Sequence, residues 1–573
     1  MGYHNIFWQN HKNAWQKIKE NDKTYLILLS ISFLLWMLSV GTFRLAALDL
    51  KNTPFMILPF SFWIGFILAT ITFFEASSNK VKYLSIILLS FYTIITLTVI
   101  EPYGRMHDSI ANIYDSQLVV DGNLEAGYGG DFPGFYLLIG ILIKITNINP
   151  WSLSRIFPVI FLIIYISFLF VLFQNIGKKI KNIRSYELPL FLYFMLVFSP
   201  TIWLRMNPAP QTIGYLLFIL TSIILIKRRD NIYFFFLFYL TYLVMVMSHP
   251  LTPILSIPGF IAIIYLETEE KGWFHDISYT LKNFSKNIII SIIVIYLSWI
   301  VYRAEGIFRQ AYGLIEEAIK YEREIPMVTQ NAPGTEFYTH LNVIYLLILF
   351  SFLLFCYFQS SKSRNGKMVT IWGLAMTPLF IINFGYRFFS RPLLFLSVPM
   401  GLIFTDSDRH LSSIDKKKIS TFFIIFLVLL SALGTYRSQY YDNALDRPTL
   451  SEIRSNNFVA LNVKKAVVAT AFNLPYDEWG NQVEFSLPKI RLNRIDIDPK
   501  SIYRRLYHAD TVIISQQLVN YAVFFEGKPY NDTALFLVEQ DLNQAFKIYD
   551  NGYDRVYFQF GELKRQWRQN MIV

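Results

Sequence analysis

The chain has 573 residues, of which 54% are hydrophobic and 16% are charged, and its mean hydropathy is +0.37. This composition excludes a large soluble protein and is typical of a chain that crosses a membrane many times. The formal net charge of +11 comes from short basic tracts between apolar segments rather than from a continuous stripe, so it does not indicate a nucleic-acid partner.

The first apolar segment, residues 25 to 43, follows a lysine-bearing N-terminal region, residues 1 to 24. No small-residue cleavage site is present and Arg44 comes next, so we expect a membrane anchor rather than a removable signal peptide. The single cysteine, Cys356, lies in a later apolar run, which excludes an intrachain disulfide and a thiolate metal site.

Apolar runs long enough for a membrane-crossing helix, which needs about 20 residues, recur as far as residue 436. About thirteen are present, so the sequence predicts a polytopic α-helical membrane domain over residues 25 to 436. The runs are 25 to 43, 54 to 74, 83 to 100, 151 to 174, 187 to 204, 211 to 226, 232 to 248, 250 to 266, 287 to 303, 341 to 358, 368 to 384, 390 to 404 and 419 to 436.

A further run, residues 135 to 146, is marginal in length, and its status sets the direction of every later span. If it lies in the interface, the basic tracts at 178 to 184, 227 to 229, 362 to 367 and 415 to 418 share a side with the lysine-rich N-terminus. If it crosses, all four tracts fall on the opposite side, against the positive-inside rule. The sequence therefore predicts a re-entrant or juxtamembrane helix here, a cytoplasmic N-terminus and an external C-terminus.

On this topology the loop 101 to 134, the loop 304 to 340 and the C-terminal residues 437 to 573 face outward. The C-terminal part is predicted to be an external α/β domain, since about 135 residues suffice for a small core. Asn551-Gly552 between two β-rich runs predicts a hairpin. The other expected elements are strands at 466 to 472 and 510 to 515 and a helix near 499 to 510.

The outward loop after the third span is rich in carboxylates. Within it, Ile110, Ile113 and Tyr114 recur at helical spacing, which predicts a short amphipathic helix along the membrane surface. The carboxylates of the loop are Glu101, Asp108, Asp115, Asp121, Glu125 and Asp131.

Asp108 and Asp115 are seven residues apart and share a face of this helix, with Arg105 one turn before Asp108. A carboxylate beside an arginine stays ionised, which suits a general base or a metal ligand better than a general acid. The alternative is that Asp108 caps the helix and the other acids are solvated loop residues.

Arginine is enriched at the outward ends of the spans, whereas most lysines of the membrane part are internal. By the positive-inside rule, lysine and arginine should both be rare on the outer side. An outward excess of arginine alone therefore indicates that these arginines bind a specific partner. The planar fork of arginine binds phosphate bidentately, which points to an anionic lipid headgroup; the alternative is snorkelling to ordinary phospholipids. The outward arginines are Arg44, Arg105, Arg155, Arg205, Arg303, Arg309, Arg323, Arg387 and Arg391.

Three further outward features are candidates for a site. His249 joins two spans, where it would serve as an acid, a base or a headgroup donor, or would make a local helix-end bond. Residues 321 to 340, which include Arg323, read as a lid-like loop or a disordered connector. Residues 386 to 391 set two arginines around aromatic residues, and an interfacial aromatic belt would also explain the latter.

The centres of the predicted spans carry no ionisable residue, which argues against an ion-coupled transporter. No P-loop, dinucleotide fingerprint, HExxH or GxSxG motif is present either. An enzyme of this kind would need a donor that is already activated and delivered within the membrane.

The order of a span, the "HDS" helix, an aspartate-bearing loop, "DFPGFYLL" and "SRIFPVIFLIIY" resembles the GT-C superfamily of integral-membrane glycosyltransferases. That superfamily uses polyprenyl-phosphate-linked sugars and includes protein mannosyltransferases, aminoarabinose transferases and oligosaccharyltransferases. The resemblance covers about residues 83 to 175 by motif. In the rest of the chain the resemblance is general, and consists of the number of predicted spans, the outward arginines and the outward C-terminal domain.

The resemblance implies that Asp108 is the catalytic aspartate. The family commonly has an adjacent acidic pair after the first span, whereas here His107 precedes Asp108 and the loop follows the third span. Three residues stay open as the second acid or a metal ligand: Asp115, Asp121 and Asp131. The expected donor-phosphate ligands are Arg105, Arg205, Arg387 and Arg391, and further candidates are His107, His249 and Arg323.

The implied activity is transfer of a sugar from a polyprenyl-phosphate donor to a lipid, glycan or protein acceptor outside a prokaryotic plasma membrane, with inversion or retention left open. No cofactor is required by the sequence, and a divalent cation, Mg²⁺ or Mn²⁺, stays open because carboxylates serve as base or ligand. The competing interpretations are a flippase for polyprenyl-linked sugars and a non-catalytic membrane assembly protein.

Overall fold

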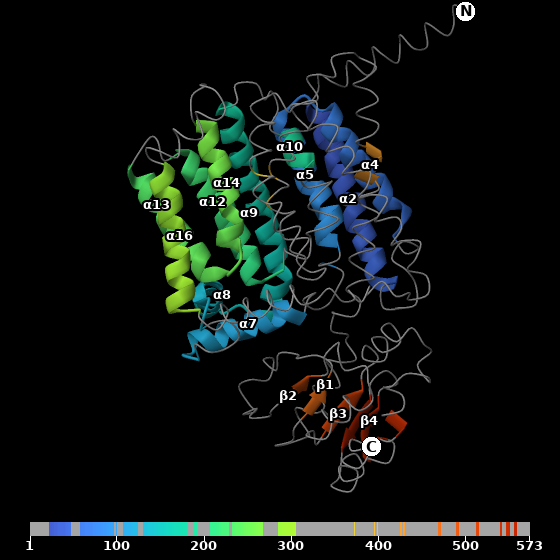
Figure 1. Ribbon diagram of the computed structural model, residues 1–573. Coiled ribbons are helices and arrows are strands. Elements are labelled where there is room, and N and C mark those ends of the chain that lie inside the picture. The colour runs from blue at the N-terminus through green and yellow to red at the C-terminus, as the bar shows by residue number, and fades with distance from the viewer. Residues whose placement is uncertain are drawn as a thin grey trace, which may run out of the picture.

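The computed structural model describes two groups of residues, a helical bundle and a small sheet (Figure 1). The predicted spans after residue 340, the loop 304 to 340 and the expected helix at 499 to 510 lie outside the described residues, apart from single positions such as Trp372. The described ranges are 22–46, 58–96, 107–123, 130–179, 187–192, 207–227, 232–267, 285–304, 468–470, 489–491, 511–514, 546–550 and 555–558, with a few isolated residues.

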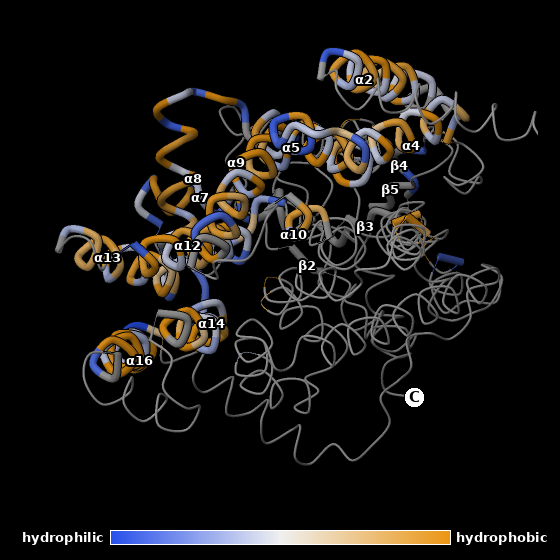
Figure 2. The backbone as a smooth tube through the Cα atoms, turned by 90° about the horizontal axis from the view of Figure 1, so that it is seen from above, coloured by the Kyte–Doolittle hydropathy of each residue, from blue (hydrophilic) through white to orange (hydrophobic). Residues whose placement is uncertain are grey.

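The helical bundle is a set of apolar helices that matches the predicted runs in position, and Figure 2 shows their mostly hydrophobic colouring from above. Among the described helices, three are long and apolar enough to cross a membrane: Lys23–Thr42, Ser152–Ile176 and Pro210–Lys227. The helices are α2 (Asp22–Ala46), α4 (Phe60–Glu75), α5 (Asn79–Ser90), η1 (Phe91–Ile95), α7 (His107–Val120), α8 (Pro133–Thr146), α9 (Pro150–Lys179), α10 (Glu187–Leu192), α12 (Pro210–Lys227), α13 (Ile232–Ser248), α14 (Thr252–Glu267) and α16 (Ser285–Tyr302).

The predicted start of the second span at residue 54 is wrong, because α4 begins only at Phe60. Pro59 precedes it with φ −64° and ψ 153°, an extended conformation. Proline is disfavoured inside a helix but accepted just before or at its first turn, so Pro59 marks the boundary.

Helices α2 and α4 run antiparallel and are joined by small polar side chains. The Ser32 hydroxyl donates to the Gly65 carbonyl oxygen at 2.7 Å, and the hydroxyls of Ser39 and Ser61 meet at 2.8 Å. As residue numbers increase along α2, the numbers of the contacting residues in α4 decrease, which is the pattern of an antiparallel pair. Small residues at such contacts allow backbones in a membrane to approach closely.

The predicted third span, residues 83 to 100, corresponds to α5 followed directly by the π-helical turn η1, and this segment runs parallel to α2. The Tyr92 hydroxyl donates to the Ser32 carbonyl oxygen at 2.6 Å, and the Trp36 indole donates to Thr96 Oγ1 at 2.8 Å. These contacts join residues 60 positions apart in the same order along both helices. The π-turn, which occurs in proteins as short single turns, was not predicted by the apolar pattern.

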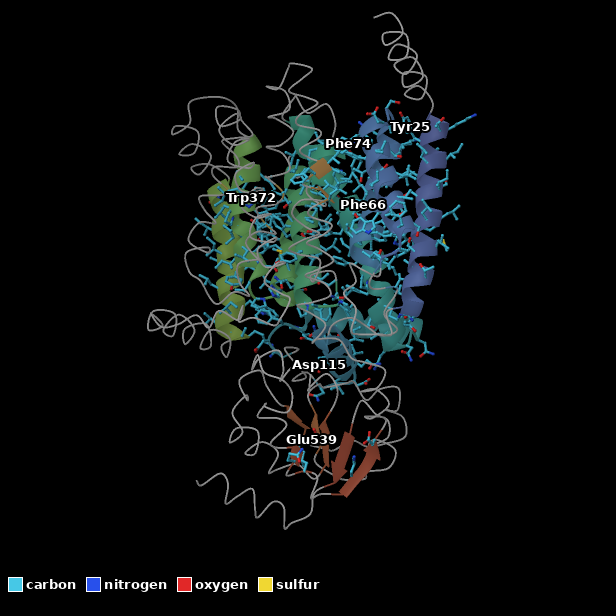
Figure 3. The ribbon with its side chains drawn as sticks, turned by 90° about the vertical axis from the view of Figure 1, so that its right-hand side faces the viewer. Tyr25, Phe66, Phe74, Asp115, Trp372 and Glu539 are labelled. Atoms are coloured by element: carbon cyan, nitrogen blue, oxygen red, sulfur yellow. The ribbon has the colours of Figure 1, made fainter. Side chains whose placement is uncertain are left out.

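Alternation of direction continues through the second half of the bundle. Helix α9 begins at the end where α7 lies, α12 begins there again, and α13 ends there before α14 starts back (Figure 1). Tyr25, near the start of α2, lies at the opposite end in Figure 3. We call these two ends of the bundle the α7 end and the far end.

Helix α8 does not cross the bundle. A Cβ atom on Gly134 near its start would meet the Ser248 hydroxyl at 2.7 Å, at the α7 end of α13. Its last residue, Thr146, is followed within four residues by α9, which also starts at the α7 end. Both ends of α8 therefore lie at one end of the bundle, as expected for residues 135 to 146.

The C-terminal strands form one mixed five-stranded sheet in the order β2-β1-β3-β5-β4. Strand β1 pairs in parallel with β2 and β3, whereas β5 pairs antiparallel with β3 and β4. Figures 1 and 3 both show the strands beyond the α7 end of the bundle. The strands are β1 (Val468–Thr470), β2 (Lys489–Arg491), β3 (Thr511–Ile514), β4 (Phe546–Asp550) and β5 (Arg555–Phe558).

The strand predictions at 466 to 472 and 510 to 515 are confirmed by β1 and β3, and the antiparallel β4–β5 pair is the hairpin predicted around Asn551-Gly552. Strand β2 was not predicted. The α/β character of the whole domain stays a prediction, since only strands and single residues of it are described.

A contact between Gly65 and Tyr92 gives a test of the packing of α2, α4 and the α5–η1 segment. A Cβ atom on Gly65 would overlap the Tyr92 hydroxyl, whereas a Cβ on Gly41 in α2 would meet nothing within 4 Å. We expect Gly65→Ala to lower stability by about 1–3 kcal/mol, as overpacking does in a tight core. Gly41→Ala is the matched control and is expected to leave stability unchanged or slightly raised, because alanine favours helix.

Thermal unfolding of the detergent-solubilised protein, followed by size-exclusion chromatography, measures both variants. Adding Tyr92→Phe to Gly65→Ala should recover part of the loss, since the overlapping oxygen is removed. Equal melting temperatures for Gly65→Ala and Gly41→Ala would contradict the packing described here.

Candidate functional site

Helix α7, His107–Val120, is the predicted amphipathic helix, and it lies across the ends of the bundle helices (Figure 1). Ile113 and Val119 are buried on its bundle side, 1% and 2% exposed. The helix contains positions 108 and 115, which the helical period places on one face two turns apart. Asp115 is half-buried and lies between the bundle and the sheet in Figure 3.

The side chains of His107 and Asp108 lie outside the described residues, although their backbone belongs to α7. The structure therefore fixes the position of the expected catalytic aspartate on the helix. Asp115 takes part in an interaction within the structure.

Asn112 connects α7 to α8 and to the segment before α12 through hydrogen bonds. Its side-chain amide donates to the Pro208 carbonyl oxygen at 3.4 Å, just before α12, and its Oδ1 accepts from the Tyr136 hydroxyl at 3.3 Å. Pro208, Tyr136 and Asn112 thus hold α7 to α8 and to the start of α12. The sequence pattern did not single out Asn112, because its partners lie 24 and 96 residues away.

A close helix contact adds to this attachment. A Cβ atom on Gly140 in α8 would overlap the Ser116 carbonyl oxygen and the Val120 side chain of α7. Only glycine allows the two backbones to approach this closely. The pair α7–α8 is therefore one packed unit at the α7 end.

Asp131 lies immediately before α8, and the backbone around it is held against α16. The Trp299 indole donates to the Asp131 carbonyl oxygen at 3.0 Å. The adjacent Phe132 is buried against Ile300 and Ala304. The Asp131 side chain is half-buried, and among the described residues its carboxylate has no ion-pair or hydrogen-bond partner.

Asp121, at the end of α7, forms an ion pair with Lys144 of α8 at 2.7 Å. Both side chains are more than half exposed, at 59% and 53%, so the pair adds little stability. A metal ion at Asp121 would have to displace the lysine, which distinguishes Asp121 from Asp131 as a candidate second acid.

His249 makes the local helix-end bond that was the alternative interpretation. Its Nδ1 accepts from the Thr252 backbone N–H at 3.1 Å and lies 2.8 Å from Thr252 Oγ1. A backbone amide can only donate, so Nδ1 carries no proton and the ring proton lies on Nε2. His249 is 8% exposed, and its Nδ1 satisfies the backbone amide of the first residue of α14.

Apart from Lys144 of α8, which lies at the α7 end, the described arginines and lysines of the bundle lie at opposite ends. Arg44 is in the last turn of α2, Arg155 in the second turn of α9 and Arg303 just after α16, all at the α7 end. Lys23 and Lys227 lie at the far end. Arg155 is half-buried, and no carboxylate lies within ion-pair distance of it among the described residues.

The other arginines singled out from the sequence lie outside the described residues. These are Arg105, Arg205, Arg309, Arg323, Arg387 and Arg391.

Within the described part of the chain, no three His, Cys, Asp or Glu side chains are grouped so that they could hold a metal ion.

No family model matches the chain, and no curated protein matches it either.

The capping role of His249 can be separated from a chemical role by two substitutions. His249→Ala removes the acceptor for the Thr252 amide and should cost about 1 kcal/mol, as lost helix caps do. His249→Asn keeps a capping acceptor and should retain most of the stability, because asparagine is a strong N-cap residue. Thermal unfolding measures both; equal losses in the two variants would contradict capping as the role.

Proposed function

We propose that this chain is a membrane glycosyltransferase of the GT-C type, which moves a sugar from a polyprenyl-phosphate donor to a lipid, glycan or protein acceptor at the α7 end of the bundle. The observation that carries the proposal is the position of α7. This helix bears positions 108 and 115 and is attached at the same end as Arg44, Arg155 and Arg303.

The distribution of lysines and arginines between the two ends also supports an assignment of which end faces the cytoplasm. Lys23 and Lys227 mark the far end, and cytoplasmic loops carry the excess of such residues. We therefore assign the far end to the cytoplasm and the α7 end, with α7 and the sheet, to the outside of the plasma membrane.

In the reaction, the acceptor hydroxyl attacks the anomeric carbon of the donor sugar. The new bond joins the acceptor oxygen to that carbon, and the bond from the carbon to the phosphate oxygen breaks, with its electron pair leaving on the phosphate. Asp108 takes or orients the acceptor proton as general base. Because a phosphate is a good leaving group, no strong general acid is needed.

Arginines would bind and neutralise the departing lipid phosphate, since their fork fits its oxygens bidentately. Arg105, Arg205, Arg387 and Arg391 are the proposed ligands. Arg155 joins them as a candidate, because it is half-buried at this end and lacks an internal acid among the described residues.

Of the three candidate second acids, Asp131 is the best placed to meet a substrate or a divalent cation. Its backbone is held by Trp299, and its carboxylate is not engaged within the described part of the chain. Asp121 is paired with Lys144, and Asp115 has a partner. If Mg²⁺ or Mn²⁺ takes part, Asp131 together with Asp108 would hold it and it would stabilise the leaving phosphate.

The lipid bound to the protein tests the donor. Mass spectrometry of lipids that co-purify in mild detergent should show a polyprenyl phosphate or its sugar conjugate, reduced in an Arg387→Ala, Arg391→Ala double variant. Lys227→Ala is the control, since it removes an exposed positive charge at the far end, away from the proposed phosphate ligands. Bulk phospholipid alone in all three samples would remove the main physical reason for the outward arginines.

The general base is tested by Asp108→Asn, which keeps the size of the side chain but cannot accept the proton. We expect transfer from the purified donor to fall by about 10²–10⁴-fold, the usual contribution of general base catalysis. Asp550→Asn in the sheet, where Asp550 pairs with Lys547 on an exposed strand, is a control expected to keep full activity. Full activity of Asp108→Asn at normal expression would exclude the glycosyltransferase assignment in favour of a flippase or assembly protein.

A further inference from the structure

The strand order of the C-terminal sheet reverses beside β1. From β1 the chain proceeds to β2 on one side, and then to β3 on the other side of β1 (Figure 1). Because β2 and β3 both pair with β1 in parallel, the last residues of these three strands lie at one edge of the sheet. We call it the carboxyl edge; the three residues are Thr470, Arg491 and Ile514.

A reversal of strand order is where open sheets with parallel strands commonly bind their ligands. Parallel connections are right-handed in nearly all proteins, so connections that leave two neighbouring strands in opposite directions cover opposite faces of the sheet. A crevice then forms outside the carboxyl ends of those two strands. Here β1 is followed by β2 on one side, and β3 is followed by β4 on the other. The strand order therefore indicates a ligand position beside Thr470 and Ile514.

Arginines lie at the carboxyl edge on both sides of this position. Arg491 is the last residue of β2 and is the register partner of Thr470. Arg555 is the first residue of β5, which is antiparallel to β3, and it is the register partner of Ile514. The antiparallel direction of β5 brings its start, rather than its end, to the carboxyl edge.

The charge of the strands is positive. Asp550 is the only acid within the five described strands, and its carboxylate forms an ion pair with Lys547 at 3.0 Å. Asp550 is also the register partner of Arg555. One carboxylate therefore stands against both arginines and Lys547, which leaves positive charge for an anionic ligand.

The spacing of the two arginines indicates the kind of anion. Strands β2 and β5 are three strand spacings apart, about 14 Å at about 4.8 Å per spacing. A ligand that meets both arginines therefore extends past the ends of β1 and β3 and carries more than one anionic group. The planar fork of arginine fits the paired oxygens of phosphates and carboxylates.

We propose that the carboxyl edge of the sheet binds a ligand with two or more oxyanion groups, phosphates or carboxylates, through Arg491 and Arg555. The ligand lies across the ends of β1 and β3, where the strand order reverses. This inference does not depend on the glycosyltransferase assignment, since it uses only the strand order and the charges of the sheet.

Isothermal titration calorimetry on the detergent-solubilised full chain tests this site with two probes, inorganic pyrophosphate and digalacturonate. We expect saturable binding that the Arg491→Ala, Arg555→Ala double variant weakens by about tenfold or more, since hydrogen bonds to charged groups are lost. Lys489→Ala is the matched control, because it removes a positive charge from the start of β2, at the opposite edge. Its dissociation constant should stay within about twofold of that of the unchanged protein, as expected for a screened charge that makes no direct contact.

The two probes separate the sources of the anion. Arginine-dependent binding of pyrophosphate alone supports the proposal with a phosphate ligand, and of digalacturonate alone with a carboxylate ligand. Saturable binding of neither probe overturns the proposal, as does equal weakening by Lys489→Ala, which is the mark of unspecific attraction. Loss of pyrophosphate binding only in the Arg387→Ala, Arg391→Ala variant would place the probe at the proposed donor site and also overturn it.

A second variant keeps the test decisive if the alanine variant does not fold. Arg491→Lys, Arg555→Lys keeps both positive charges and removes both planar forks. We expect it to elute as the unchanged protein does in size-exclusion chromatography and to bind the probes more weakly. Unchanged binding by this folded variant would overturn the role of the arginine forks.

Discussion

Helix α8 has 14 residues and is therefore about 21 Å long, whereas the hydrocarbon core of a bilayer is about 30 Å thick. A helix of that length is shorter than the core, and both its ends lie at the α7 end of the bundle. This constraint agrees with the direction of α9 and of the later described helices α12, α13, α14 and α16. If α8 crossed, the ends of α9 and α12 that carry Lys179 and Lys227 would change sides.

The attachment of α7 depends on that arrangement. Asn112, Tyr136 and Pro208 can meet only when α7, the start of α8 and the start of α12 share one end of the bundle. Glycine at position 140 then lets the two surface helices pack backbone to backbone. In a membrane, where neighbouring helices gain little from the hydrophobic effect, such close packing and buried hydrogen bonds supply the specificity. A close glycine contact combined with a buried hydrogen bond also occurs at Gly65 and Tyr92, where α2, α4 and the α5–η1 segment meet.

The sequence was enough to predict those elements that are specified by neighbouring residues alone. The α7 helix follows from helical spacing around Ile113, and the β4–β5 hairpin from Asn551-Gly552. The Trp299 bond to Asp131 could not be predicted, since it joins residues 168 positions apart. The π-turn η1 also escaped prediction, because its residues are as apolar as those of an ordinary helix, and the hydrogen bonds that Tyr92 and the adjacent Thr96 make with α2 are long-range.

For the candidate site, sequence reasoning found the carboxylates but could not rank them, because their ranking depends on neighbours. Asp121 meets Lys144 only because α8 folds back beside α7, and the ion pair engages that carboxylate. Asp131 is held through its backbone, which fixes the position of the residue and leaves its carboxylate without a partner among the described residues. A site that must bind a charged donor needs a fixed and unengaged carboxylate, since an engaged one must first break its own ion pair. Under the proposed function, position within the fold rather than residue type therefore favours Asp131 as the second acid.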